Sequence, residues 1–188
     1  NLSLSSGAYA LKDSYDENVI AAMFSGAGTT VGSDGSGTDT GFGSSETDPT
    51  DILANSAKRL HAADVPTDNR WFLGTPEFYE QLGQASAKLM DASVTGDATS
   101  PLRNGNVMDG LVNGFRLYMT NNFAASSTSN YFKVLSGHMS STATANHIAK
   151  IEVIRDTDSF SDVVRGLHVF GRKVLRDTAL VAEHLLID

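Results

Sequence analysis

Residues 163–174 read Val-Val-Arg-Gly-Leu-His-Val-Phe-Gly-Arg-Lys-Val, and this stretch decides the fold that the sequence predicts. It contains four valines and no proline, and it follows a polar, acidic run over residues 156–162. Such a composition favours an extended strand over a helix. We therefore expect one long extended element over Val163–Val174, followed by a closing apolar segment over Ala179–Ile187.

Shorter strands are expected upstream of this element. One of them alternates apolar and polar residues, as a half-buried strand does. The expected strands are Arg70–Leu73, Phe115–Met119, Tyr131–Leu135 and Ile151–Arg155. The residues from Ala143 onward predict a short helix or an irregular segment instead, and Val107–Val112 predicts a short helix or turn.

Helical signals favour three helices. The first is expected over Ser14–Phe24 with Asp13 as its N-cap. The second begins at Pro49, because proline suits the first helical position, and it ends before Val65-Pro66. The third begins at Pro76. Apolar residues at helical spacing predict that one face of the first helix packs on a partner, through Tyr15, Val19, Ile20, Met23 and Phe24.

Three polar segments separate these elements. Gly26–Asp48 is rich in Gly, Ser, Thr and Asp, which predicts a long surface loop or extended arm, with a flexible linker as the alternative. Ser93–Asn106 and Ala124–Asn130 are turn-rich and are expected at the surface. We find no internal repeat.

Composition excludes several classes of protein. The 188 residues are 40% hydrophobic and 19% charged, which is typical of a globular chain with a core of its own. The absence of cysteine excludes disulfides, thiolate metal sites and cysteine nucleophiles. A net charge of −8 disfavours a nucleic-acid reader, which needs Lys and Arg to displace phosphate counterions.

The sequence shows no membrane or secretory signal. No apolar run approaches the roughly 18 residues that span a bilayer. The first ten residues have neither a basic start nor an apolar core, so we expect no signal peptide. The sequence begins at Asn1 rather than Met, which indicates a processed or incompletely covered chain.

Motifs for catalysis or metal binding are missing, and we predict no catalytic, cofactor-binding or metal-binding residue. The sequence lacks a nucleophile elbow, a phosphate loop, a zinc-protease helix and a dinucleotide fingerprint. A Ser-His-Asp triad remains open, because geometry rather than spacing defines it. The five histidines are too scattered to share a helical face, and we expect surface or packed roles for His61, His138, His147, His168 and His184.

Two other candidates have simpler explanations. Asp156, Asp158 and Asp162 cluster as calcium ligands sometimes do. A calcium hand needs glycine at its sixth position and glutamate at its twelfth, where this chain has Ser161 and Leu167. The single tryptophan, Trp71, lies in an apolar strand and is expected in the core.

The order of the elements resembles a known family more than any single motif does. The stretches concerned are Tyr9–Ala22, Asp51–Leu60, Val65-Pro66, Arg70–Leu73, Pro76–Tyr79, Asn113–Tyr118, Val164–Arg176 and Ala179–Val181. In this order they resemble the major capsid proteins of tailed double-stranded DNA bacteriophages. That shell fold is shared with encapsulins and with the herpesvirus capsid floor.

The resemblance implies an α+β fold with a peripheral domain and an inserted axial domain. Residues 1–50 would hold the end of the spine helix of the peripheral domain and the Gly/Ser-rich loop. Residues 51–155 would form the axial domain, and residues 156–188 would return to the peripheral domain. The spine helix and the long closing strand are expected to pack together.

The resemblance also implies a function without catalysis. The chain would be a structural subunit that associates with copies of itself in hexamers and pentamers, forming an icosahedral or prolate shell. That shell would enclose double-stranded DNA without binding it specifically, and an acidic wall suits this role. The expected location is the virion, with assembly in the host cytoplasm, possible scaffolding, portal or decoration partners, and no membrane or cofactor.

Two alternatives remain open. An encapsulin-like nanocompartment shell shares the resemblance in fold. An acidic hydrolase or binding module belongs to another class, because fold does not fix function. Two features depart from the family: the 188 residues leave no room for an N-terminal arm and extended hairpin before the spine helix, so that these parts would be uncovered here, removed or absent, and Gly26–Asp48 is long for that junction.

Gly171→Val tests the placement of the long strand. If neighbouring backbone passes close to residue 171, a side chain there is expected to disrupt shell assembly. Electron microscopy of purified particles measures the effect, and normal particles from this variant would count against the placement.

Overall fold

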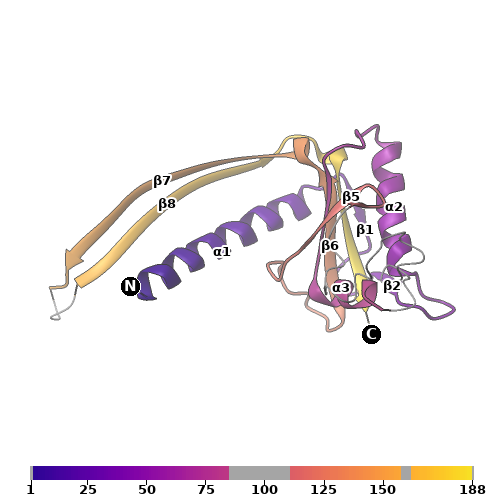
Figure 1. Ribbon diagram of the computed structural model, residues 1–188, viewed down its shortest axis with the longest axis horizontal. Helices are drawn as coiled ribbons and strands as arrows, with labels where there is room; N and C mark the ends of the chain where they lie inside the picture. The colour runs from indigo at the N-terminus through magenta and orange to yellow at the C-terminus, as the bar shows by residue number, and fades with distance from the viewer. Residues whose placement is uncertain (1, 85–110, 158–161, 188) are drawn as a thin grey trace, which may run out of the picture.

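Seven strands form one mixed sheet, beside which a long helix and a separate two-stranded ribbon extend as an arm (Figure 1). The computed structural model describes residues 2–84, 111–157 and 162–187. We use the name "body" for the large sheet with its covering helices. The name "arm" denotes helix α1 (Leu2–Ser25) with the ribbon of β7 (Thr142–Arg155) and β8 (Asp162–Val174).

Strand β9 pairs with more strands than any other described strand of the body. It is antiparallel to β6 on one side, and β1 and β2 run parallel to it on the other. Strand β3 lies between β6, which is antiparallel to it, and β5, which is parallel. The order is β1 (Thr29–Val31), β9 (Leu180–Ile187), β6 (Tyr131–His138), β3 (Arg70–Gly74), β5 (Phe115–Met119) and β4 (Leu111–Val112), with β2 (Thr38–Thr40) also on β9.

Helices α2 (Pro49–Ala62) and α3 (Pro76–Leu82) cover one face of this sheet. Both begin with proline at the first or second helical position, as expected from the sequence. The core between helices and sheet is aliphatic and aromatic, and its largest members are Ile52, Leu53, Leu60, Phe72, Phe78, Leu82, Phe115, Val134 and Leu185.

A buried carboxylate in this core forms an ion pair with a partly exposed arginine. Glu183 on β9 accepts hydrogen bonds from Ser56 Oγ, at 2.9 Å, and from Arg59 Nη1, both on α2. Burial raises the pKa of Glu183, while the charge of Arg59 and the two hydrogen bonds oppose that rise. These contacts connect α2 to β9. Without Arg59, the charged form of the buried Glu183 carboxylate would destabilise the fold.

The arm is held together by aromatic contacts between its helix and its ribbon. The Tyr15 ring lies 5.0 Å from Phe170 and 5.7 Å from His168, measured between centroids. A Cβ added to Gly26 would meet a side-chain carbon of Val174 at 2.8 Å, so the helix end lies directly on the ribbon. The expected packing of spine helix against closing strand is confirmed.

The first helix is longer than the sequence indicated. It begins at Leu2 rather than Ser14, so Asp13 is not an N-cap. Asp13 lies inside α1 and accepts a hydrogen bond from Asn122 Nδ2 at 2.7 Å. Asp13, which resembled a helix cap in the sequence, therefore makes a tertiary contact instead. Although α1 has 24 residues, neither it nor any other described helix is apolar enough to cross a bilayer.

Three other local expectations are wrong. Residues from Ala143 onward are extended, because β7 pairs along its length with β8 despite its polar composition. Leu111 and Val112 form β4 instead of a helix or turn. Residues 26–48 are not only a loop, since they supply β1 and β2 to the edge of the sheet beside β9. Residues 93–106 and 107–110 lie outside the described part of the chain.

Trp71 does not belong to the core. Because successive residues of a strand face opposite sides, Phe72 takes the core side and Trp71 is only partly buried on the other face. Gly171 also differs from expectation, since a Cβ there would meet nothing within 4 Å. Any backbone close to that position would have to come from outside the described chain.

The α+β class is confirmed, and the sheet draws on all parts of the chain. Strands β1 and β2 come from residues 1–50, β3 to β6 from residues 51–155, and β9 from residues 156–188. The division into domains at residues 50 and 155 stays a prediction.

Replacing Arg59 with Met tests the ion pair with Glu183. The change leaves Glu183 without its cation and is expected to lower the free energy of unfolding by about 3 kcal/mol at pH 8. The loss should shrink toward pH 5: a carboxyl whose pKa is raised by folding begins to cost stability as the pH rises above its ordinary pKa, and costs it in full above the raised pKa. Urea unfolding at both pH values measures the effect.

The matched control is Lys58→Met, at an exposed neighbouring position, which should change stability by less than about 0.5 kcal/mol. Equal losses for Arg59→Met at pH 5 and pH 8 would contradict the assignment.

Candidate interaction surfaces

The histidines lie apart in different environments. Each has a structural neighbour or is exposed: His61 contacts the Arg70 guanidinium, His138 bonds with Ser140, His147 is exposed on the ribbon, His168 contacts Tyr15 and Asn146, and His184 is buried in the sheet. Among the described residues, no group of three or more His, Asp or Glu could hold a metal ion. The absence of a catalytic or metal site stays a prediction.

The acidic cluster near the ribbon tip is only partly described. Asp156 follows β7, Asp162 opens β8 opposite Arg155, and Asp158 lies outside the described residues. Nothing in the described geometry supports cation binding there.

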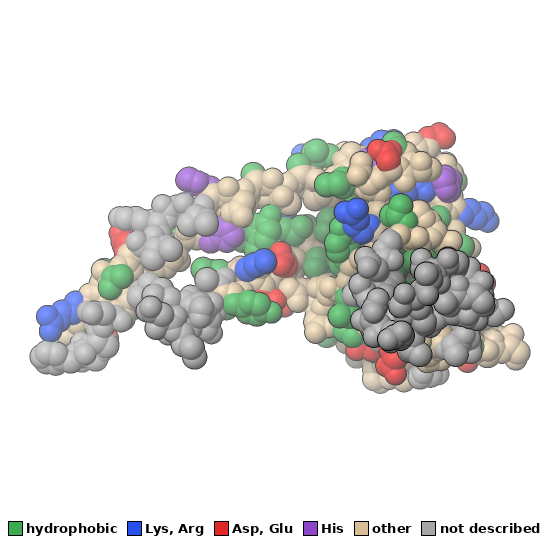
Figure 2. Space-filling model, viewed as in Figure 1, with side chains coloured by type: hydrophobic (Ala, Val, Ile, Leu, Met, Phe, Trp, Pro, Cys, Tyr) green, Lys and Arg blue, Asp and Glu red, His purple; other side chains and the backbone are tan. Residues whose placement is uncertain are grey.

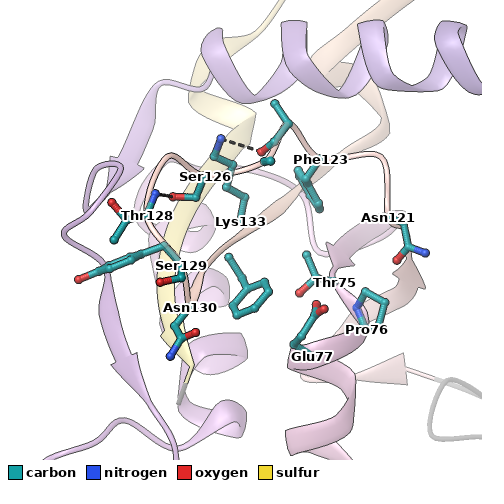
Figure 3. Close-up of a pocket in the computed structure, with 14 residues that line it drawn as sticks. Thr75, Pro76, Glu77, Asn121, Phe123, Ser126, Thr128, Ser129, Asn130 and Lys133 are labelled. Atoms are coloured by element: carbon teal, nitrogen blue, oxygen red, sulfur yellow. Dashed lines mark hydrogen bonds between the residues drawn. The ribbon is translucent and has the colours of Figure 1, made fainter.

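A hollow of about 570 Å³ lies under the segment 121–130, beside the start of α3 (Figure 3). Its lining mixes hydroxyl and amide side chains with apolar ones such as Phe123 and Phe132, and it includes two charged residues, Glu77 and Lys133. Lys133 Nζ donates to the Ala124 carbonyl at 2.9 Å. The charged side chains among its described lining residues are Glu77 and Lys133, and in the described part of the chain neither forms a hydrogen bond with a Ser or Thr hydroxyl of the hollow.

Asp34 fastens the turn between β1 and β2 to this segment. Its carboxylate accepts hydrogen bonds from Ser126 Oγ, from Ser127 Oγ at 2.6 Å and from Ser127 N at 3.1 Å. These bonds to the charged form lower the pKa of Asp34 to about 2. We call this contact the Asp34 clasp. It fixes two surface segments that are distant in sequence.

The ribbon presents an open face on the side away from α1. His168 and Phe170 face α1, so the alternating residues between and around them face outward. On that outer face, Leu167 is 59% exposed, Val169 51% and Val163 40%. We call these three residues the outer row. Exposed Arg165 and Lys173 share the face.

A second hollow, of about 620 Å³, lies where the arm meets the body. Val19 and Met23 of α1 face Trp71 and Tyr118 across it. Figure 2 shows hydrophobic side chains gathered in this region. The single tryptophan therefore lies beside the helix that connects arm and body.

Known proteins share this architecture. A chain from Mycobacterium phage Che8 superposes with a TM-score of 0.76 and 32% identity, over 95% of this chain and 61% of that chain. The capsid structure of cyanophage P-SCSP1u gives 0.67 and 16%, over 94% and 62%. An encapsulin of Synechococcus elongatus gives 0.59 and 13%, over 97% and 63%. No curated protein matches the sequence.

These likenesses place the fold in the class of shell-forming subunits that phage capsids and encapsulins share. A sequence model described as "Phage capsid protein" matches residues 4–182. The chain belongs to this phage capsid protein family, as the order of its elements indicated. It spans about three fifths of the length of the phage chains that it matches.

The surfaces were only partly visible in the sequence. Residues 163–169 predict an extended strand, in which every second residue lies on the same face, yet the sequence does not say which face α1 covers. The Asp34 clasp and the hollow beside Trp71 join segments far apart in sequence, and no local pattern reports them.

Replacing Asp34 with Ala tests the clasp. The Ser127 amide then loses its charged acceptor, and its hydrogen-exchange protection at pH 5 should fall roughly tenfold. In the unaltered protein the clasp should persist at pH 4: a carboxyl with a lowered pKa loses its contribution only as the pH falls through about 2. NMR-detected exchange, normalised to intrinsic rates, measures both.

Asp39→Ala, at an exposed position on β2, is the control and should leave Ser127 protected. Unchanged protection in Asp34→Ala would show that the clasp does not hold the segment.

Proposed function

We propose that this chain is the shell-building part of a bacteriophage major capsid protein, whose copies associate laterally through the arm. The observation that carries this proposal is the outer row of the ribbon. Family membership supports it, and so does the likeness to phage chains over nearly all of this chain.

The ribbon is expected to gain stability from contact with a partner. A two-stranded ribbon is marginally stable by itself, and α1 supports only one of its faces. The other face exposes Leu167 and Val169 beside cationic Arg165 and Lys173. Clustered apolar surface with a charged rim is typical of protein interfaces. Contact with another copy would bury the row, and repetition around symmetry axes would sum many modest contributions.

The charge of the chain suits a container for nucleic acid. With a net charge of −8, its surface is expected to repel DNA rather than bind it, so packaged DNA would be enclosed without specific contacts. Hexamers and pentamers, a place in the virion, assembly in the host cytoplasm and contacts with scaffolding, portal or decoration proteins belong to the same proposal. We propose no enzymatic activity.

An encapsulin-like compartment is the second candidate, favoured by the likeness to the Synechococcus elongatus encapsulin. The contents of purified particles discriminate between the two. Nuclease-protected double-stranded DNA supports the phage capsid, and a co-purified protein cargo supports the compartment.

Leu167→Glu tests the outer row in the full-length protein. A carboxylate in an apolar contact is costly to desolvate, so the yield of particles at a given concentration should fall at least tenfold. Since Leu167 is exposed in the single chain, the melting temperature of the unassembled protein should change little. Size-exclusion chromatography and negative-stain electron microscopy measure assembly.

Leu167→Met keeps the site apolar and is the matched control, expected to assemble normally. If Leu167→Glu gave as many particles as the wild type, the outer row would not be part of the interface. Full-length protein that stays monomeric at high concentration would instead contradict shell building itself.

A further inference from the structure

The end of α1 is seated on the sheet through one aromatic ring. Phe24, in the last turn of the helix, lies edge-on to His184 of β9, with 5.2 Å between the ring centroids. Phe123 lies 6.2 Å from the same ring, and Lys133 Nζ of β6 lies 5.7 Å from its centroid. Three separate parts of the body thus hold the ring in place.

His184 is enclosed and has an unused nitrogen. The residue is 6% exposed, and its buried Nδ1 has no hydrogen-bond partner among the described residues. The turn between β1 and β2 approaches the side chain from one side: a Cβ added to Gly32 would lie 3.3 Å from His184 Cβ. Lys133 is its direct neighbour across the sheet.

Few charged groups face this imidazole. Lys133 approaches from β6 and Asp34 from the turn between β1 and β2, where the clasp already engages the carboxylate. Residues 18–25 of α1 and residues 121–130 contain no charged side chain. Glu183 precedes His184 on β9 and points to the opposite face, toward α2. A proton on His184 would therefore find no free anion.

Burial, and then the positive charge of Lys133, lower the pKa of His184, while Asp34 acts in the opposite direction. A histidine whose pKa is lowered by folding costs stability as the pH falls, because the opened state takes up the proton more readily. The stability of the seated state is complete above the pKa of an exposed histidine and is lost as the pH falls below it.

We infer that Phe24, His184 and Lys133 form an acid-sensitive joint that releases the end of α1 from the sheet when His184 gains a proton. The cation would share the Phe24 ring with the Lys133 ammonium, and the two repel each other. Attraction to the ring is weaker than the cost of an unpaired buried charge, so the imidazolium gains most by reaching water. It reaches water when Phe24 leaves.

The movement would change the angle between arm and body. Because α1 packs on β8 through Tyr15, helix and ribbon are expected to move together. The hollow beside Trp71 would open at the same time, since Val19 and Met23 of α1 form one of its walls. The joint thus couples the protonation of one side chain to the direction in which the arm extends.

Trp71 provides the test, because it is the single tryptophan of these 188 residues and lines the same hollow as Val19 and Met23 of α1. Lowering the pH from 8 should shift its fluorescence to longer wavelength, with a midpoint below the pKa of an exposed histidine, while far-UV circular dichroism stays unchanged. His184→Gln should abolish the transition. His147→Gln and His168→Gln are the controls and should retain it.

Two charge variants provide an independent measurement if His184→Gln does not fold. Lys133→Met should lower the midpoint and Asp34→Asn should raise it, each by roughly half a pH unit or more, because the seated state tolerates the proton better without the repelling charge and worse without the attracting one. A transition that persists in His184→Gln, midpoints that do not move in these opposite directions, or no transition before global unfolding would each overturn the joint. None of these readouts requires particles, so they are separate from the test of shell building.

Discussion

Strand β9 imposes the constraint on which the rest of the molecule depends, because it needs cover on both of its faces. Its residues from Leu180 to Leu185 are all buried, and it pairs with β1, β2 and β6. Helices α2 and α3 cover the face that carries Glu183. The end of α1 and the segment 121–130 cover the face that carries His184. One face of β9 thus packs in the core, and the opposite face attaches the arm.

Local sequence patterns predicted the elements that have clear start signals or a strongly apolar composition. Proline at the helix starts placed α2 and α3, and apolar composition placed β8 and β9. The first part of strand β7 was missed, although Ile151–Arg155 was expected as a strand, because its ladder with β8, rather than its own composition, makes it extended. The start of α1 was misplaced because Asp13 resembles a cap, whereas its carboxylate is used by Asn122, which is 109 residues away.

The interaction surfaces also differ in how far the sequence predicts them. An alternating row such as that of β8 can be read from sequence, but the exposed face is decided by where α1 lies. The order of elements indicated the family, since order survives where individual motifs are weak. The contacts of Phe24, His184 and Asp34 bring together segments from opposite ends of the chain, so they become visible only with the fold.

The parallel pairing of β1 with β9 also governs the order of folding. Thr29 lies opposite Val181, so an edge strand and its neighbour in the sheet come from distant parts of the sequence, and their pairing closes a very long loop. During synthesis, β1 and β2 have no partner until β9 has emerged, while the ribbon can pair as soon as its hairpin is complete. The arm can therefore take shape before the body that carries it, and the sheet of the body becomes complete only once β9 has been made.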